Sequence, residues 1–171
     1  MCLLCERSRK ICKRFKGEKS VIYIARAEEK DAKLLTDIKV RALEHEVFMR
    51  YGRMRRGISL YDVIETETVL MKKYQVYKIV HNNKIIGGFF LDNYEENKMR
   101  VEDLAIEPKY QGRGYGLQVL QMVEEVHPDV KEWSLSTLAH SSSNQQMYEK
   151  AGYVEIDRDE EEVQYRKVIA G

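Results

Sequence analysis

The run from Gln111 to Gly116 has the residue types of an anion-binding loop. Three of its six residues are glycines, and the apolar spacing from Arg113 to Val126 predicts a helix at this point. Glycine tolerates positive φ, so the loop can turn tightly and direct consecutive backbone N–H groups at one ligand. The N-terminus of the helix adds a partial positive charge. The sequence therefore predicts a site for a phosphate or diphosphate.

Two other nucleotide-binding motifs fit this loop poorly. A Rossmann fingerprint needs G-x-G-x-x-G on the first strand-to-helix turn and an acidic residue about twenty positions later, whereas these glycines have another spacing and come late in the element order. A Walker loop needs Gly-Lys-Ser or Gly-Lys-Thr at its end, which is absent here. A glycine-rich structural turn without a ligand stays open as an alternative.

Helix-like and strand-like segments alternate on both sides of the loop. Asn82-Asn83 predicts a tight hairpin, because asparagine tolerates positive φ. Ser142 and Gln145 have the spacing of a capping box, and Gly152 suits the end of that helix. We expect strands at 21–25, 74–80, 84–91, 99–106, 131–138, 153–156 and 163–169, and helices at 28–49, 58–71, 113–126 and 142–152.

This order of elements predicts a mixed α/β (α+β) fold with helices on the faces of the sheet. We expect a largely antiparallel sheet of roughly six to seven strands, flanked by about four helices. At 171 residues the chain has room for one domain of ordinary size. We place that domain at residues 21–171, after an N-terminal extension of residues 1–20.

The extension is basic and contains the three cysteines Cys2, Cys5 and Cys12. Its C-x-x-C pair is half of a zinc-site spacing without a second half, so we expect no metal. The net charge of +1 argues against a nucleic-acid partner, although weak binding through the extension stays open. Apolar runs are too short for a membrane span, and no signal peptide is recognisable. We therefore expect a cytoplasmic protein without a membrane partner.

Two motifs resemble the GNAT superfamily, the N-acetyltransferases that move an acyl group from CoA to an amine. The phosphate signature of that family is Q/R-x-x-G-x-G/A after a strand, and a second family segment reads N-x-x-x-Y-x-x-x-G-(F/Y). The element order also matches across about residues 21–168. The first motif is matched by Gln111, Gly114 and Gly116, and the second by Asn144, Tyr148, Gly152 and Tyr153.

The resemblance implies acetyl-CoA as co-substrate. Backbone N–H groups of the loop would bind the pyrophosphate, and the strand before it would pair with the pantetheine arm. An N–H near Leu104 or Ala105 would polarise the thioester carbonyl. The CoA-binding residues implied in this way are Leu104, Ala105, Ile106, Gln111, Gly112, Arg113, Gly114, Tyr115, Gly116, Asn144 and Tyr148.

The resemblance also implies two catalytic residues. Tyr148 would be the general acid that protonates the departing CoA thiolate, with a simple core aromatic as the alternative. Glu102 would be the general base; it precedes Leu104 by two residues, which places both on one face of a regular strand, whereas Asp103 would face the other way. A solvated carboxylate, or one that only binds the cation of the acceptor, is the alternative for Glu102. No nucleophile on the protein is expected, because the family transfers directly in a ternary complex.

The acceptor stays open at this point. An arginine cluster (Arg50, Arg53, Arg55 and Arg56) would suit an anionic acceptor, whereas the acidic turn at 157–162 would suit a polyamine or an aminoglycoside. A solvated loop is the alternative for each. A CoA-binding sensor without activity is the alternative to an enzyme. A homodimer is also open.

Overall fold

The structure, a computed structural model, describes residues 10–14, 21–52 and 68–170. Within these ranges the strands form a single eight-stranded sheet in the order β1-β2-β3-β4-β5-β6-β8-β7. All neighbours are antiparallel except β5 and β6. The predicted mixed fold class is confirmed. The strands are Lys10–Arg14 (β1), Val21–Arg26 (β2), Gln75–His81 (β3), Lys84–Glu95 (β4), Lys98–Ile106 (β5), Glu132–Leu138 (β6), Val154–Arg158 (β7) and Glu162–Val168 (β8).

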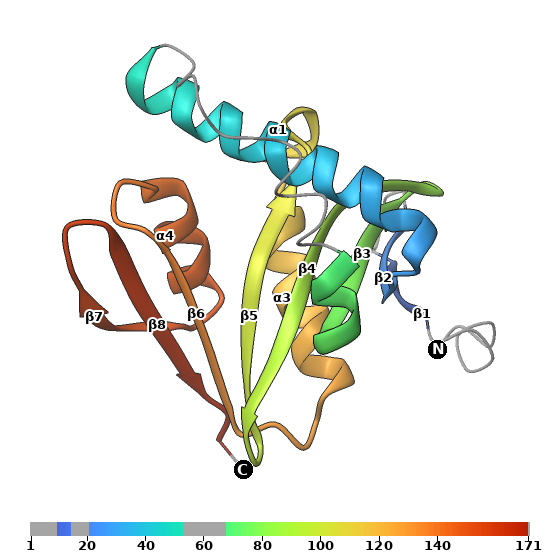
Figure 1. Ribbon diagram of the computed structural model, residues 1–171. Coiled ribbons are helices and arrows are strands. Elements are labelled where there is room, and N and C mark those ends of the chain that lie inside the picture. Colours follow the sequence, from blue (N-terminus) through green and yellow to red (C-terminus); the bar gives the residue numbers. More distant parts are fainter. Residues whose placement is uncertain (1–9, 15–20, 53–67, 171) are drawn as a thin grey trace.

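Helices cover both faces of the sheet (Figure 1). Part of the predicted helix 58–71 lies outside the described residues, and residues 68–73 are helical. Further helices and 3₁₀ turns span Glu29–Asp31 (η1), Ala32–Tyr51 (α1), Pro108–Tyr110 (η2), Tyr115–Val126 (α3) and Ser142–Lys150 (α4).

The two sides of the sheet are packed by different means. On one side α1 lies close to β4, and a Cβ built on Gly88 would come within 2.9 Å of Leu35 Cδ2. On the other side α3 buries an apolar stripe in the main core. Each fully buried side chain of this kind contributes about 1.5–3 kcal/mol. The stripe consists of Val119, Leu120, Met122 and Val123.

Strand β1 lies within the segment that the sequence assigned to an N-terminal extension. It pairs antiparallel with β2, from Lys10 opposite Ala25 to Arg14 opposite Val21. Three of its five residues are charged, so the segment lacks the apolar alternation by which strands are predicted. Cys2 and Cys5 lie outside the described residues. No helix in the described part of the chain is long and apolar enough to cross a membrane.

Local turn chemistry agrees with the sequence at one site and departs from it at another. Asn82 and Asn83 take φ of 47° and 65°, so the predicted hairpin is confirmed. The predicted capping box is wrong, because Ser142 is already the first residue of α4 and its N-cap, Ser141, makes no side-chain cap. Gln145 Nε2 instead donates to Ala139 O at 2.8 Å and holds the preceding loop.

Candidate active site

Strands β5 and β6 pair for only three residues and then separate. Their parallel register covers residues 98–100 of β5 and 132–134 of β6. Beyond it β6 continues against β8 as far as Leu138, and β5 continues against β4 as far as Ile106. Figure 1 shows the two strands diverging toward α1 and α4. The β6-facing edge of β5 beyond residue 100 is therefore not paired with a described strand.

A bulge interrupts β5 at the start of this free edge. Glu102 lies opposite Phe90 and Ala105 opposite Gly88, so β5 has one residue more than β4 over the same stretch. Asp103 takes φ of 53° and pairs with Lys39 at 2.9 Å. The regular alternation that we assumed between Glu102 and Leu104 is therefore wrong.

The glycine loop reverses the chain between β5 and α3. Gly112 and Gly114 have φ of 72° and 78°, and a Cβ on either would meet nothing within 4 Å. Glycine is thus required here by backbone conformation and not by crowding. Gln111 Nε2 donates to Ile106 O at 2.7 Å, which fastens the loop to the end of β5.

Helix α3 begins at Tyr115, two residues later than predicted, so Arg113 belongs to the loop. Gln118 N donates to Gly114 O at 3.2 Å, and the N–H groups of residues 115–117 precede this bond and have no partner within the helix. Lys109 and Arg113 lie 5.4 and 5.7 Å from the ring centre of Tyr110. Unpaired N–H groups, open space at the glycines and two cations together fit a diphosphate such as that of CoA.

Gly116 is a glycine for a different reason. It is buried, and a Cβ at this position would overlap Met147 Sδ. Helices α3 and α4 therefore approach each other closely at Gly116. The sequence could not distinguish this packing requirement from a requirement of the loop.

Tyr148 on α4 lies in a cluster with Tyr153 and Tyr165. Its side chain is only 5% exposed, and its ring centre lies 5.7 Å from that of Tyr165. It makes no hydrogen bond with another residue in the described part of the chain. Burial raises the pKa of Tyr148 well above its usual value, and the nearby carboxylates of Glu46 and Glu102 raise it further. The phenol is therefore protonated at neutral pH.

Glu102 stands at the point where the two strands part. Its carboxylate pairs with Arg100, and Arg100 Nη2 also donates to Ser136 Oγ at 2.9 Å across to β6. Burial raises the pKa of Glu102 above 4.5, and the charge of Arg100 opposes that rise without cancelling it. Glu102 is thus a stronger base than an exposed glutamate.

Asn144 connects α4 to β6. Its Nδ2 donates to Thr137 Oγ1 at 3.3 Å, and Thr137 is buried. Leu104, Ala105 and Ile106 lie on the last part of β5, against the glycines of β4. The structure therefore brings Glu102, Tyr148, Asn144, the end of β5 and the glycine loop to one end of the sheet. Their roles toward CoA stay predictions.

Glu46 on α1 is a further residue of this region that was not predicted from the sequence. Its Oε1 is buried and has no hydrogen-bond partner in the described ranges, and its charge acts on the Tyr148 hydroxyl. No motif marks this residue, because it reaches the site only through the way α1 crosses the sheet. Of the arginines noted beside it, Arg50 contacts His140 Nδ1, while residues 53, 55 and 56 lie outside the described ranges.

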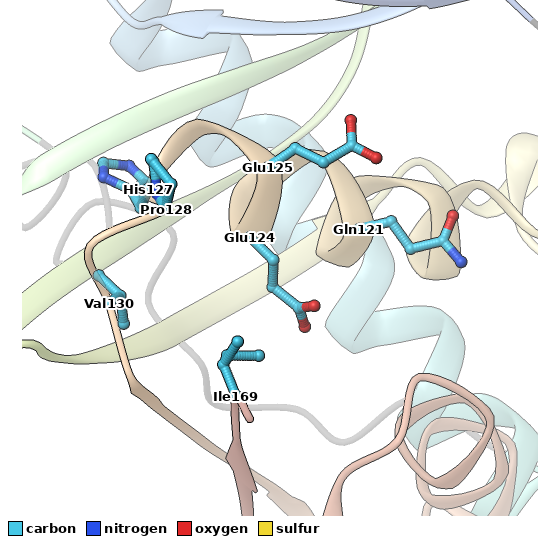
Figure 2. A pocket seen from close by; sticks show the side chains of 7 residues that line it. All are labelled: Gln121, Glu124, Glu125, His127, Pro128, Val130 and Ile169. Carbon is cyan, nitrogen blue, oxygen red and sulfur yellow. The ribbon is translucent and has the colours of Figure 1, made fainter. Parts of the chain in front are cut away.

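A hollow in the surface lies elsewhere. About 470 Å³ in volume, it is bounded by Glu124, His127 and Ile169 among others, at the C-terminal end of α3 (Figure 2). The twelve residues of α3 rise by roughly 18 Å, which separates this hollow from the glycine loop. Burial lowers the pKa of His127 there. The described residues contain no group of three metal-binding side chains, here or near Tyr148.

Residues 72–155, which contain the glycine loop, Glu102 and Tyr148, match the family described as the acetyltransferase (GNAT) domain. The chain carries a GNAT acetyltransferase domain. None of the curated proteins matches this sequence.

Several solved structures share the GNAT fold with this chain. Their sequence identities to it are low, so the likeness concerns the fold alone. An acetyltransferase of Thermus thermophilus is 18% identical, with a TM-score of 0.72 over 86% of this chain and 97% of its own. The PaiA N-acetyltransferase of Thermoplasma acidophilum, solved in complex with coenzyme A, is 16% identical, with a TM-score of 0.68 over 86% and 99%. A spermidine N-acetyltransferase SpeG chimera from Vibrio cholerae and hSSAT is 13% identical, with a TM-score of 0.65 over 86% and 95%.

Proposed function

We propose that the protein transfers an acetyl group from acetyl-CoA to a primary amine by direct attack in a ternary complex. The observation that carries this proposal is the position of Tyr148. Its protonated hydroxyl lies buried within electrostatic reach of Glu102, where β5 and β6 separate. An acid and a base at one point are the groups that aminolysis of a thioester requires.

The glycine loop and the free edge of β5 support the CoA part of the proposal. The N–H groups of residues 112–117 bind the pyrophosphate at the N-terminus of α3. The edge of β5 at 104–106 pairs with the pantetheine arm as a further strand would, and its N–H near Leu104 or Ala105 polarises the thioester carbonyl. Asn144 holds α4 in position for this arrangement through Thr137.

The chemical step forms a C–N bond and breaks the C–S bond. The amine nitrogen attacks the thioester carbonyl and loses a proton to Glu102, whose raised pKa suits a base. The CoA sulfur departs with the bonding electron pair and takes a proton from Tyr148. The products are an acetamide and the CoA thiol.

Measurement of thiol release tests the proposal. The protein and acetyl-CoA are mixed with one class of amine at a time. The classes are alkylamines, amino acids, peptides with a free N-terminus and lysine-containing peptides. We expect release above background with at least one class, and calorimetry should show CoA binding without any amine. If the folded protein bound CoA but released no thiol with every class, it would be a CoA-binding sensor and the proposed activity would be rejected.

A further inference from the structure

Helix α1 spans the separation between β5 and α4. Lys39 pairs with Asp103 of β5 at 2.9 Å, and Arg50 contacts His140 in the loop before α4. Residues 39, 46 and 50 are seven and four apart, so they share one face of the helix. Since both ends of this face touch the walls of the separation, Glu46 faces into it. Figure 1 shows α1 beginning on the β2 side of the sheet and crossing past the end of β5 toward the side of α4.

One polar atom in this space is buried without a hydrogen-bond partner among the described residues. Glu46 Oε1 is inaccessible to solvent and accepts no hydrogen bond from any residue that the structure describes. The Tyr148 side chain is more than nine-tenths buried, and its hydroxyl bonds to none of the residues that the structure describes. An unpaired buried carboxylate oxygen is costly, so a site of this kind calls for a ligand that donates hydrogen bonds.

The charges at the site are unequal. Arg100 compensates the carboxylate of Glu102, whereas Glu46 forms no ion pair within the described ranges. Both carboxylates act on the Tyr148 hydroxyl, so each of them lies within interaction range of that hydroxyl. A bound cation would restore the balance of charge beside Glu46.

We propose that Glu46 binds the acceptor as its ammonium, and that the acceptor class is a primary amine that carries no carboxylate. This inference rests on the proposed acetyl transfer. Glu46 accepts a hydrogen bond from the ammonium, which releases one proton to water to become the neutral amine. The nitrogen then attacks the thioester and loses its second proton to Glu102. An acceptor with its own carboxylate in this space would be repelled by Glu46 and Glu102.

Glu46→Gln tests the inference, with Glu44→Gln as the matched control. Glu44 lies two residues away on another face of the same helix. The probes are butylamine, 1,4-diaminobutane and 4-aminobutyrate, which share a chain length and differ in charge. We expect the wild type to prefer the two carboxylate-free amines by about tenfold or more in kcat/KM. In Glu46→Gln their KM should rise by about tenfold or more, because a charge-assisted hydrogen bond is lost.

Affinity for CoA, measured by calorimetry, should be unchanged in both variants, which also shows that they are folded. An unchanged amine KM in Glu46→Gln, or a wild-type preference for 4-aminobutyrate, would overturn the inference while leaving acetyl transfer intact. Absence of thiol release by the wild type with every amine class would reject the proposed function and the inference together.

Discussion

Gly116 on α3 and Met147 on α4 touch so closely that a methyl group on the glycine would overlap the thioether sulfur. The helix that begins at the glycine loop is thereby packed directly against the helix that carries Tyr148. The position of the proposed acid thus depends on a residue that belongs to the CoA motif.

Gly116→Ala should therefore destabilise the protein by about 1–3 kcal/mol, the usual cost of overpacking a core. Thermal unfolding should show a lower Tm. Met147→Ala removes the obstructing sulfur, so the double variant should recover part of the loss that Gly116→Ala causes. If Gly116→Ala lowered the Tm equally in the wild type and in Met147→Ala, the contact between Gly116 and Met147 would not be the cause of the destabilisation.

Gly114→Ala should act on binding more than on packing. A Cβ at this position has open space, but φ of 78° costs a non-glycine residue about 1 kcal/mol or more. The loop should shift to relieve that strain, so the Kd for CoA should rise about fivefold or more with little change in core stability. Calorimetry measures the Kd for CoA directly. An unchanged Kd would show that the conformation of the loop at Gly114 does not contribute to CoA binding.

The sequence predicted features that local chemistry determines. Asn82-Asn83 specifies its hairpin through the φ values that asparagine tolerates, and the glycines of the loop do the same. The bulge at Asp103 escaped prediction because it depends on how β5 pairs with β4, which the residue pattern of β5 alone does not encode. Glu46 escaped for a similar reason, since only the crossing of α1 over the sheet brings it to Tyr148.

Glu102 should control the acid limb of the pH profile. Its pKa is raised by burial, so the basic form is lost at a higher pH than for an exposed glutamate. The fall of kcat/KM toward acid pH should therefore be centred above pH 4.5. Glu102→Gln should remove most of the activity and, in the activity that remains, this dependence on pH. Glu95→Gln, at an exposed ion pair with Lys98, should leave the profile unchanged.

The same shift has a consequence for stability. A carboxyl with a raised pKa binds its proton more tightly in the folded state than in the unfolded state. Its contribution to stability is present below the ordinary pKa and is lost as the pH rises through the folded value. Glu102→Gln should therefore flatten this part of the curve of unfolding free energy against pH, and an unaltered curve would contradict the assignment.

Tyr148→Phe should slow turnover by about a hundredfold or more, the range of general acid catalysis. CoA affinity should be nearly unchanged, because the backbone of the loop is unaffected. Tyr165→Phe is the matched control. It removes a buried hydroxyl that has no partner from the same cluster, so kcat should be retained. Equal rates for both variants would remove Tyr148 from the mechanism.

Mass spectrometry of the complete reaction tests the central claim most directly. The protein is mixed with acetyl-CoA and an amine that supports thiol release, and the reaction is quenched during turnover. The masses of the amine and of the intact protein are then measured. We predict one acetylated amine for each CoA thiol released and no acetyl group on the protein. Thiol release without acetylated amine, or an acetyl group on the protein that chases into product, would contradict direct transfer to an amine.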